Sequence, residues 1–318
     1  MKIITLLVVT VLLLAAVSVP AEAPPSDAGF LQDFSIALPA SSHVTVRLIV
    51  PPLGEKTRGK MVWADVTFAV GPGDTVWFGH DGNTVINFSR DYIFRTDRTF
   101  TDIAVLTGGA LLIAGRTDLG FVPAGGLSAA DGRVASVSVQ PIFLLPVKDC
   151  RLSAGEKGAL YLSGTGRESG KEEVHLVRPE PAAPDRNARM VVRTTRKIYV
   201  STEKVSAVAG DGDETVIATG RLVFNVTAGR DALEPIFLHP REAITGLALS
   251  RAYGLFYATP SGVGYAGPNG NVEFIKAPNV SIRIAGGALY VFLKNSMAVV
   301  KVEGIDAFRD LPLSGPAK

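Results

Sequence analysis

The chain has 318 residues, and its 32 basic residues nearly balance its 30 acidic residues, which gives a net charge of +2. A charge this close to neutrality excludes a general attraction to nucleic acid or to an anionic membrane surface. The single cysteine, Cys150, excludes an intramolecular disulfide. Because it lies in an apolar stretch, a buried structural cysteine is favoured over a reactive thiol.

The first predicted element is an N-terminal secretory signal. Lys2 precedes an apolar run over 3–19, and small residues follow at Ala21 and Ala23. This pattern is typical of a signal peptide, and we predict one over 1–21, followed by a linker over 22–29. An uncleaved membrane anchor is the alternative. The signal predicts a protein secreted across an inner membrane, periplasmic or extracellular and bacterial. No later stretch is apolar and long enough to span a membrane.

Beyond the linker, one unit recurs six times: an apolar strand, a Gly-centred turn and a second apolar strand. The copies are VTFAVGPGDTVWFG (66–79), DIAVLTGGALLIAG (102–115), RLSAGEKGALYLSG (151–164), SAVAGDGDETVIATG (206–220), GLALSRAYGLFYATP (246–260) and SIRIAGGALYVFLK (281–294). Asp-Gly pairs such as Asp81-Gly82 and Asp211-Gly212 mark tight hairpin turns. Strands that are apolar at nearly every position must be covered on both faces, as in stacked sheets.

The spacing of the copies predicts an all-β, six-bladed β-propeller, with seven blades as the alternative. Successive copies begin 35 to 55 residues apart, close to the 40–45 residues of a four-stranded blade once two insertions, over 125–134 and 178–189, are removed. The last unit has too few strands. We therefore expect N-terminal strands over 34–38 and 43–50 to complete it and close the ring. The predicted propeller spans 30–312, and 313–318 form a tail.

In its repeating unit the chain resembles NHL-type and related six-bladed envelope propellers. The resemblance covers about three quarters of the chain and implies architecture, not chemistry. The sequence has no Gly-His and Trp-Asp pair of the WD40 type and no Tyr-Trp-Thr-Asp motif, and the kelch double glycine does not occur in every unit. The early Glu-Gly-Pro metal-binding motif of lactonase-type six-bladed enzymes is also missing, which argues against a calcium lactonase.

Residues for catalysis or metal binding are sparse. The four histidines, His43, His80, His175 and His239, do not form a zinc-binding spacing. The sequence has no nucleophile elbow and no phosphate-binding loop. The acidic run 210–214 is the most calcium-like segment, although its place between two strands favours a solvated hairpin turn. We predict no metal and no cofactor, with calcium as the open alternative, and we lean against an enzyme.

The repeat predicts one functional face, because loops entering the first strand and leaving the second strand of each blade gather around the axial opening. The entering loops contribute acidic residues and the leaving loops mostly cationic ones, and we expect such a concave surface to bind a ligand. The predicted ligand- or partner-binding residues are Asp65, His80, Asp102, Arg116, Asp149, Arg167, Arg221, Lys294 and Asn295. The alternative is that these turns are polar only because they are exposed to solvent.

Two functions from different classes are favoured, and a third, a structural subunit of a larger surface assembly, would be indicated by an exposed apolar patch on a blade edge. The first is a non-enzymatic binding or scaffold module for a protein or glycan partner in the cell envelope, favoured by the well-defined scaffold and the lack of a catalytic set. The second is a metal-assisted hydrolase or lyase with its site at the axial opening. Two or three carboxylates converging at that opening would favour the second.

Overall fold

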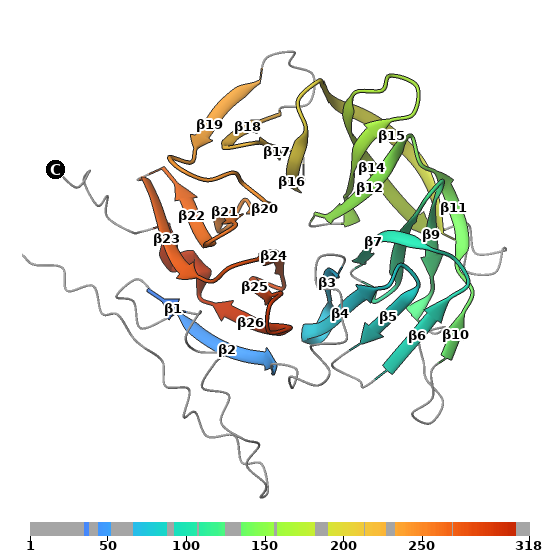
Figure 1. The fold of residues 1–318 in the computed structure, drawn as a ribbon, viewed down its shortest axis with the longest axis horizontal. Coiled ribbons are helices and arrows are strands. Elements are labelled where there is room, and N and C mark those ends of the chain that lie inside the picture. The colour runs from blue at the N-terminus through green and yellow to red at the C-terminus, as the bar shows by residue number, and fades with distance from the viewer. Residues whose placement is uncertain are drawn as a thin grey trace, which may run out of the picture.

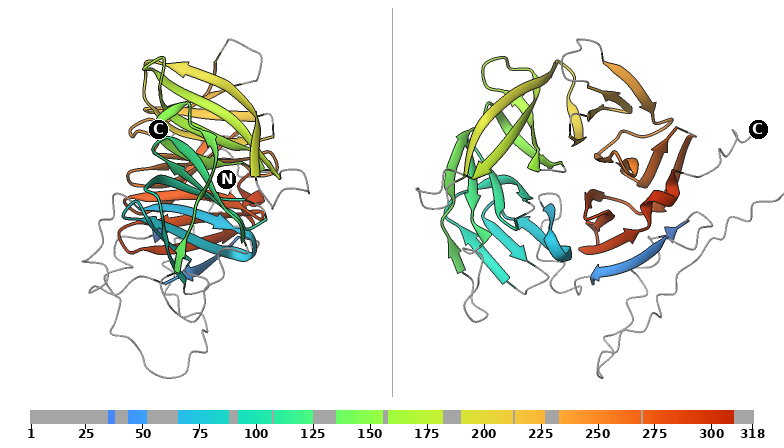
Figure 2. Two further views of the ribbon diagram at one scale, coloured as in Figure 1. Left: turned by 90° about the vertical axis from the view of Figure 1, so that its right-hand side faces the viewer. Right: turned by 180° about the vertical axis from the view of Figure 1, so that it is seen from behind.

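The protein is a ring of six twisted sheets around a central axis (Figures 1 and 2). The structure is a computed structural model, and it describes residues 35–37, 44–51, 66–87, 92–106, 108–124, 135–155, 158–181, 190–212, 214–226, 233–268 and 270–309. The predicted six-bladed β-propeller is confirmed.

Each blade has four antiparallel strands, ordered from the axis outward. The blades are numbered 1 to 6 in the order in which they are given next. The blades, from the innermost strand, are β3 (Thr67–Gly71), β4 (Thr75–His80), β5 (Thr84–Asn87) and β6 (Tyr92–Thr96); β7 (Phe100–Val105), β8 (Leu111–Gly115), β9 (Asp118–Val122) and β11 (Gln140–Leu144); β12 (Val147–Ala154), β13 (Leu160–Gly166), β14 (Glu172–Pro181) and β15 (Met190–Ser201); β16 (Val205–Asp211), β17 (Glu214–Thr219), β18 (Leu222–Asn225) and β19 (Glu234–Leu238); β20 (Gly246–Ser250), β21 (Gly254–Thr259), β22 (Gly262–Gly267) and β23 (Gly270–Lys276); and β24 (Val280–Ala285), β25 (Ala288–Leu293), β26 (Ala298–Glu303) and β2 (Thr45–Val50).

The N-terminal strands close the ring, although they are shared between two blades. Strand β2 pairs antiparallel with β26 and supplies the outer strand of blade 6, as predicted. The earlier segment was expected in the same blade, which was wrong: β1 (Ser35–Ile36) pairs with β23 and adds a fifth strand to blade 5. Blade 6 lacks one strand only, so the second segment binds the next free edge. Strand β10 (Ala135–Val137) likewise adds a fifth strand to blade 1, in parallel with β6.

The core lies between neighbouring blades, so the middle strands are buried on both faces. Every residue of β25 is buried, and Leu112 in β8 is fully buried. The apolar clusters each combine residues of two adjacent blades, as where Phe68 and Phe78 of blade 1 pack on Phe292 of blade 6 with ring centroids 5.4 and 4.8 Å away. This stacking explains strands that are apolar at every position.

A network of charged groups joins blade 6 to blade 1 at the closure. The Lys301 ammonium donates to Asp74 at 2.8 Å and to Glu303 at 2.9 Å. The Tyr290 hydroxyl donates to the second oxygen of Asp74, and Arg47 on β2 donates to Glu303 at 2.7 Å. Each cation of this network has a carboxylate partner, so the charges fasten the two ends of the chain together.

Short turns and two 3-10 helices complete the described structure. The predicted Asp81-Gly82 turn is confirmed: it lies in the short turn over 81–83 between β4 and β5, and both residues have positive φ (52° and 66°). The 3-10 helices are Pro72–Asp74 and Ile305–Phe308. Within the described ranges, no helix is both long enough and apolar enough to cross a membrane.

Candidate functional site: the axial cavity

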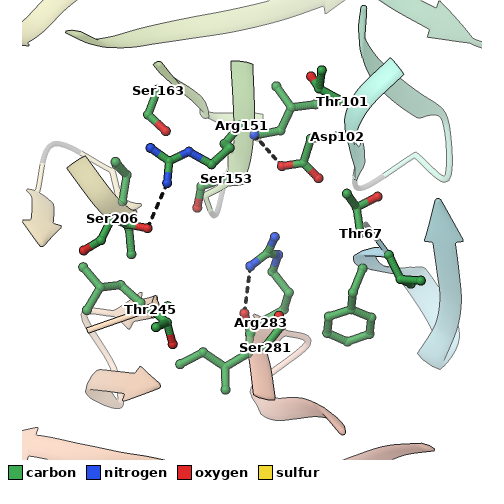
Figure 3. Close-up of a pocket in the computed structure, with 18 of the residues that line it drawn as sticks. Thr67, Thr101, Asp102, Arg151, Ser153, Ser163, Ser206, Thr245, Ser281 and Arg283 are labelled. Atoms are coloured by element: carbon green, nitrogen blue, oxygen red, sulfur yellow. Dashed lines mark hydrogen bonds between the residues drawn. The ribbon is translucent and has the colours of Figure 1, made fainter. Parts of the chain in front are cut away.

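A large cavity lies on the propeller axis, toward the end where most of the innermost strands begin. It has a volume of about 590 Å³ and is lined by residues of all six innermost strands. Every blade contributes at least one hydroxyl side chain near this wall: Thr67, Thr101, Ser153, Ser163, Ser206, Thr245 and Ser281. Figure 3 shows these side chains in a ring around the opening. A concave site with convergent polar groups of this size is suited to a small ligand or one group of a larger ligand.

The walls change character further along the same strands. Two small voids of about 20 and 30 Å³ follow the cavity, and they are lined mostly by Ala, Val, Leu and Ile side chains. Arg283 on β24 lines the cavity and both voids. It therefore forms the floor of the polar half of the channel, and its guanidinium points into the middle of the ring (Figure 3).

The guanidinium of Arg283 has few hydrogen-bond partners in the described structure. Its guanidinium donates to the carbonyl oxygen of Ile282 at 2.9 Å, and it has no ion pair in the described part of the chain. Protein surrounds the side chain, although the channel leaves it some exposure. This burial lowers the pKa of Arg283, while the nearby charge of Asp102 acts in the opposite direction.

Asp102 on β7 is buried, and both of its carboxylate oxygens are already bonded. One oxygen accepts from the backbone N–H of Ile103 at 2.8 Å and the other from that of Leu152 on β12 at 2.7 Å. The carboxylate thus bridges blades 2 and 3. Burial raises the pKa of Asp102, and the charge of Arg283 and the two N–H donors oppose this rise. Asp102 is a carboxyl group held in a fixed position in the wall.

Arg151 is a second cation at the cavity, and backbone carbonyl oxygens of blade 4 hold its side chain. Its guanidinium donates to the carbonyl oxygens of Ser206, at 3.1 Å, and Val205, and one nitrogen lies 3.7 Å from the Glu172 carboxylate. These contacts fix Arg151 across the gap between blades 3 and 4 (Figure 3). The side chain is 39% exposed.

Lys294 lies at the end of β25 and completes the charged wall. Burial lowers the pKa of Lys294, the like charge of Arg283 lowers it further, and the charge of Asp102 partly compensates. Its ammonium has no hydrogen bond or ion pair among the residues described. Two cations, Arg283 and Lys294, therefore face the cavity without a carboxylate partner at contact distance.

Of the residues predicted from the sequence, the structure brings Asp102 and Lys294 into the cavity wall. His80 is buried beside the cavity, and its Nδ1 lies 2.8 Å from a carboxylate oxygen of Asp81. Asp81 itself lines the cavity. Asp65 lies outside the described residues. The others lie in the turns or strand starts away from the lining: Arg116, Asp149, Arg167, Arg221 and Asn295.

Three of these outer residues have side-chain hydrogen bonds, and in one of them Asn295 accepts from the Asn279 amide at 3.1 Å. Arg167 donates to the carbonyl oxygen of Leu145 at 2.8 Å and to that of Arg116, so it links blade 3 to blade 2. Arg221 donates to the carbonyl oxygen of Pro240 at 2.9 Å.

Sequence reasoning missed Arg151, Arg283 and the hydroxyl ring. A signal was present, because the residue just before the aligned apolar position is polar in five of the six repeat copies: Thr67, Asp102, Arg151, Ser206 and Ser281. Successive side chains of a strand point to opposite faces, so the residues at this shared position lie on the same side of their strands. In the propeller this is the side that faces the axis. Arg283, two residues further along its strand, is the one arginine at that position among the six copies.

Two other sequence predictions concern Cys150 and the acidic run. Cys150 is 1% exposed, and burial raises the pKa of its thiol, which confirms a buried structural cysteine. The acidic run forms a hairpin turn between β16 and β17, with Asp213 outside the described residues. Asp211 accepts from the backbone N–H of Arg251 in blade 5 at 2.7 Å, so its carboxylate connects two blades.

Comparison with known proteins shows similarity of fold. No protein-family model matches the sequence, and no curated protein sequence matches it. Among solved structures, a calcium-binding protein, regucalcin, from Agrobacterium tumefaciens is 13% identical, with a TM-score of 0.54 over 84% of this chain and 97% of that one. XC5397 from Xanthomonas campestris, described as a gluconolactonase, is 12% identical, with a TM-score of 0.50 over 84% of this chain and 98% of that one. At these identities the similarity defines a propeller and leaves its chemistry open.

Calcium, which the first of these proteins binds, is a poor match for the described cavity wall. Calcium takes six to eight oxygen ligands, usually several carboxylates. The described wall offers Asp81 at the rim and Asp102, whose oxygens already accept two N–H groups. Within the described ranges, no three His, Cys, Asp or Glu side chains lie close enough to hold a metal. Two unpaired cations in the same wall would also repel a divalent cation.

Proposed function

We propose that this propeller is a non-enzymatic binding module whose axial cavity binds an acidic group of a protein or glycan partner. The observation that carries the proposal is the pair Arg283 and Lys294, two cations that face one cavity without an ion-pair partner among the described residues. Unpaired charges in a partly buried site are costly, and an incoming carboxylate would remove that cost. The hydroxyl ring supplies further donors and acceptors for the same ligand.

The secretory signal predicted over 1–21 supports an envelope location for this binding. The signal lies outside the described residues, so the location is a proposal from the sequence. A cell-envelope protein meets acidic polysaccharides and acidic protein segments, and both present carboxylates on a flexible chain that can enter a cavity of about 590 Å³.

The test measures affinity for three probes: a galacturonic acid hexasaccharide, a hexaglutamate peptide and the neutral maltohexaose. Wild type should bind at least one acidic probe with an affinity that falls with salt, and should not bind the neutral sugar. The variant Arg283→Met with Lys294→Met should lose at least about tenfold in affinity, which is about 1.4 kcal/mol.

The matched control is Arg116→Ala with Arg221→Ala, which removes the same number of positive charges from outside the cavity lining. It should weaken binding by less than the axial pair does, because exposed charges act through screened solvent. An equal loss in both double variants would move the binding surface to the outer turns. Binding of neither acidic probe by wild type would contradict the proposal.

A metal-assisted hydrolase at the same opening is the second candidate, and the overlap of fold with XC5397, described as a gluconolactonase, favours it. It predicts calcium-dependent hydrolysis of gluconolactone by wild type. Our proposal predicts a rate equal to the uncatalysed reaction with and without calcium. A calcium-dependent rate that Asp102→Asn abolishes would establish the hydrolase instead.

A further inference from the structure

Lys294 differs from the other buried or paired lysines of the described chain. Lys301 lies 2.8 Å from Asp74, and Lys197 lies 2.8 Å from Glu173. The Lys294 side chain lines the axial cavity, and its ammonium contacts no carboxylate in the described structure. Its backbone is fixed, because its N–H donates to the carbonyl oxygen of Asn279 at 3.2 Å. An anchored lysine thus presents its amine to an accessible cavity.

The surroundings make the Lys294 amine easier to deprotonate than the amine of an exposed lysine. Burial and the like charge of Arg283 lower the pKa of Lys294, and Asp102 is the opposing charge. The other charged residues that line the cavity are Arg151, which is held by carbonyl oxygens, and Asp81 at the rim. A lysine that is desolvated and beside a second cation is a typical nucleophilic amine.

We propose that Lys294 captures an aldehyde or ketone that carries an acidic group, by forming an imine with it in the axial cavity. The inference rests on the proposed function, because Arg283 would hold the acidic group of the same ligand. The cavity opening gives the ligand access, and the hydroxyl ring can bond the carbonyl oxygen while it accepts charge.

The chemistry needs no oxidant or metal. The lone pair of the Lys294 amine forms a C–N bond to the carbonyl carbon, and the C=O electron pair moves to oxygen. The amine loses a proton and the oxygen gains one, which gives a carbinolamine. The C–O bond then breaks and the oxygen takes up a second proton and leaves as water, while the nitrogen lone pair forms the C=N bond and the nitrogen releases its remaining proton. The sum is carbonyl plus amine to imine plus water, and it is reversible.

The experiment traps the imine by reduction. Wild type is incubated with glyoxylate, which combines an aldehyde with a carboxylate, and sodium cyanoborohydride delivers hydride to any C=N bond. Mass spectrometry of peptides then gives the rate of carboxymethylation at each lysine. Exposed Lys204 and Lys276 serve as internal controls. We expect Lys294 to react at least roughly tenfold faster than either control at neutral pH.

Two variants and one probe sharpen the result. Lys294→Arg keeps the charge and removes the primary amine, so fast labelling should vanish while Lys204 and Lys276 react as before. Arg283→Met should slow labelling at Lys294 and move its pH profile to higher pH, because the like charge is gone. Glycolaldehyde, which lacks the acid, should label Lys294 more slowly than glyoxylate does.

The outcomes separate this inference from the proposed function. Equal labelling rates at Lys294, Lys204 and Lys276 overturn the inference, and if acidic hexasaccharide or peptide still binds, the proposed function stands. Fast labelling of Lys294 by glyoxylate and glycolaldehyde alike, without acid binding, overturns the acidic-ligand part of both. An unchanged pH profile in Arg283→Met also overturns it, because the activation by a neighbouring cation would then be wrong.

Discussion

The closure between blades 6 and 1 and the axial cavity both contain charged side chains inside the protein, but they differ in how those charges are paired. At the closure, Lys301 has Asp74 and Glu303 within 2.9 Å, and Arg47 has Glu303 at 2.7 Å. In the cavity, Arg283 donates to one backbone carbonyl, and Lys294 has no partner among the described residues. A network complete in itself holds the fold together. A set of charges left incomplete by the fold is available to a ligand.

The comparison also separates shape from chemistry. All six innermost strands carry apolar residues at several positions, and small apolar voids continue the cavity along them. The polar half depends on one position of each repeat, where the copies differ. Under the proposed function, the repeat architecture would set where a ligand binds, and the variable axial position would set which ligand it is.

A buried charge with neither partner nor cavity should have the largest effect. Leu112 is fully buried between blades 2 and 3, so Leu112→Asp should lower the free energy of unfolding by about 4 kcal/mol or more. Urea unfolding followed by tryptophan fluorescence measures this change, and Leu112→Ala controls for the lost volume. A melting temperature equal to wild type would contradict the burial of this strand.

Breaking the closure network should have the next largest effect. Lys301→Met removes both contacts to Asp74 and Glu303 and should lower the free energy of unfolding by about 2 to 3 kcal/mol, less than for a fully buried pair because Asp74 is 40% exposed. The matched control Lys276→Met, at an exposed position on β23, should change it by less than about 0.5 kcal/mol. Equal effects would show that the closure network contributes no stability.

The same network predicts a dependence of stability on acid. Hydrogen bonds from Lys301 lower the pKa of Asp74 and of Glu303 below their ordinary values of 3.8 and 4.5. Hydrogen bonds from Lys197, His175 and Ser169, which outweigh burial, lower the pKa of Glu173 to about 2.

Carboxyl groups with lowered folded pKa values bind fewer protons in the folded state than in the unfolded state. Their stabilisation is therefore complete above about pH 5 and is lost as pH falls through the folded values. We expect the closure pair to account for about 1 kcal/mol of this loss, since both groups are partly exposed. Between pH 7 and pH 3, the free energy of unfolding should fall less steeply with decreasing pH in Lys301→Met than in wild type. Identical slopes in the two proteins would contradict this assignment.

Much of the fold could be predicted from the sequence because it is written six times. The copies gave the blade number, the inner strands and the Asp81-Gly82 turn. The placement of β1 could not be predicted, because a two-residue strand carries too little pattern to choose between two free edges. The site was predicted only in part. Asp102 and Lys294 were predicted because they lie near the ends of the strands. Arg283 was missed because it lies within an apolar strand, and only the position of the propeller axis shows that its side chain faces the cavity.

The smallest effect on stability is expected in the cavity. Arg283→Met replaces an unpaired cation with an apolar side chain of similar length, and it removes the repulsion on Lys294. It also removes the attraction to Asp102, so the two changes offset each other and the free energy of unfolding should change by at most about 1 kcal/mol. Thermal unfolding at low salt measures it, with Lys301→Met as the contrasting variant. A loss in Arg283→Met as large as in Lys301→Met would mean that Arg283 is a structural charge, already paired within the protein. In that case the distinction between a complete closure and an incomplete cavity would fail. A small change together with lost binding of the acidic probes would place Arg283 in binding and the closure network in stability.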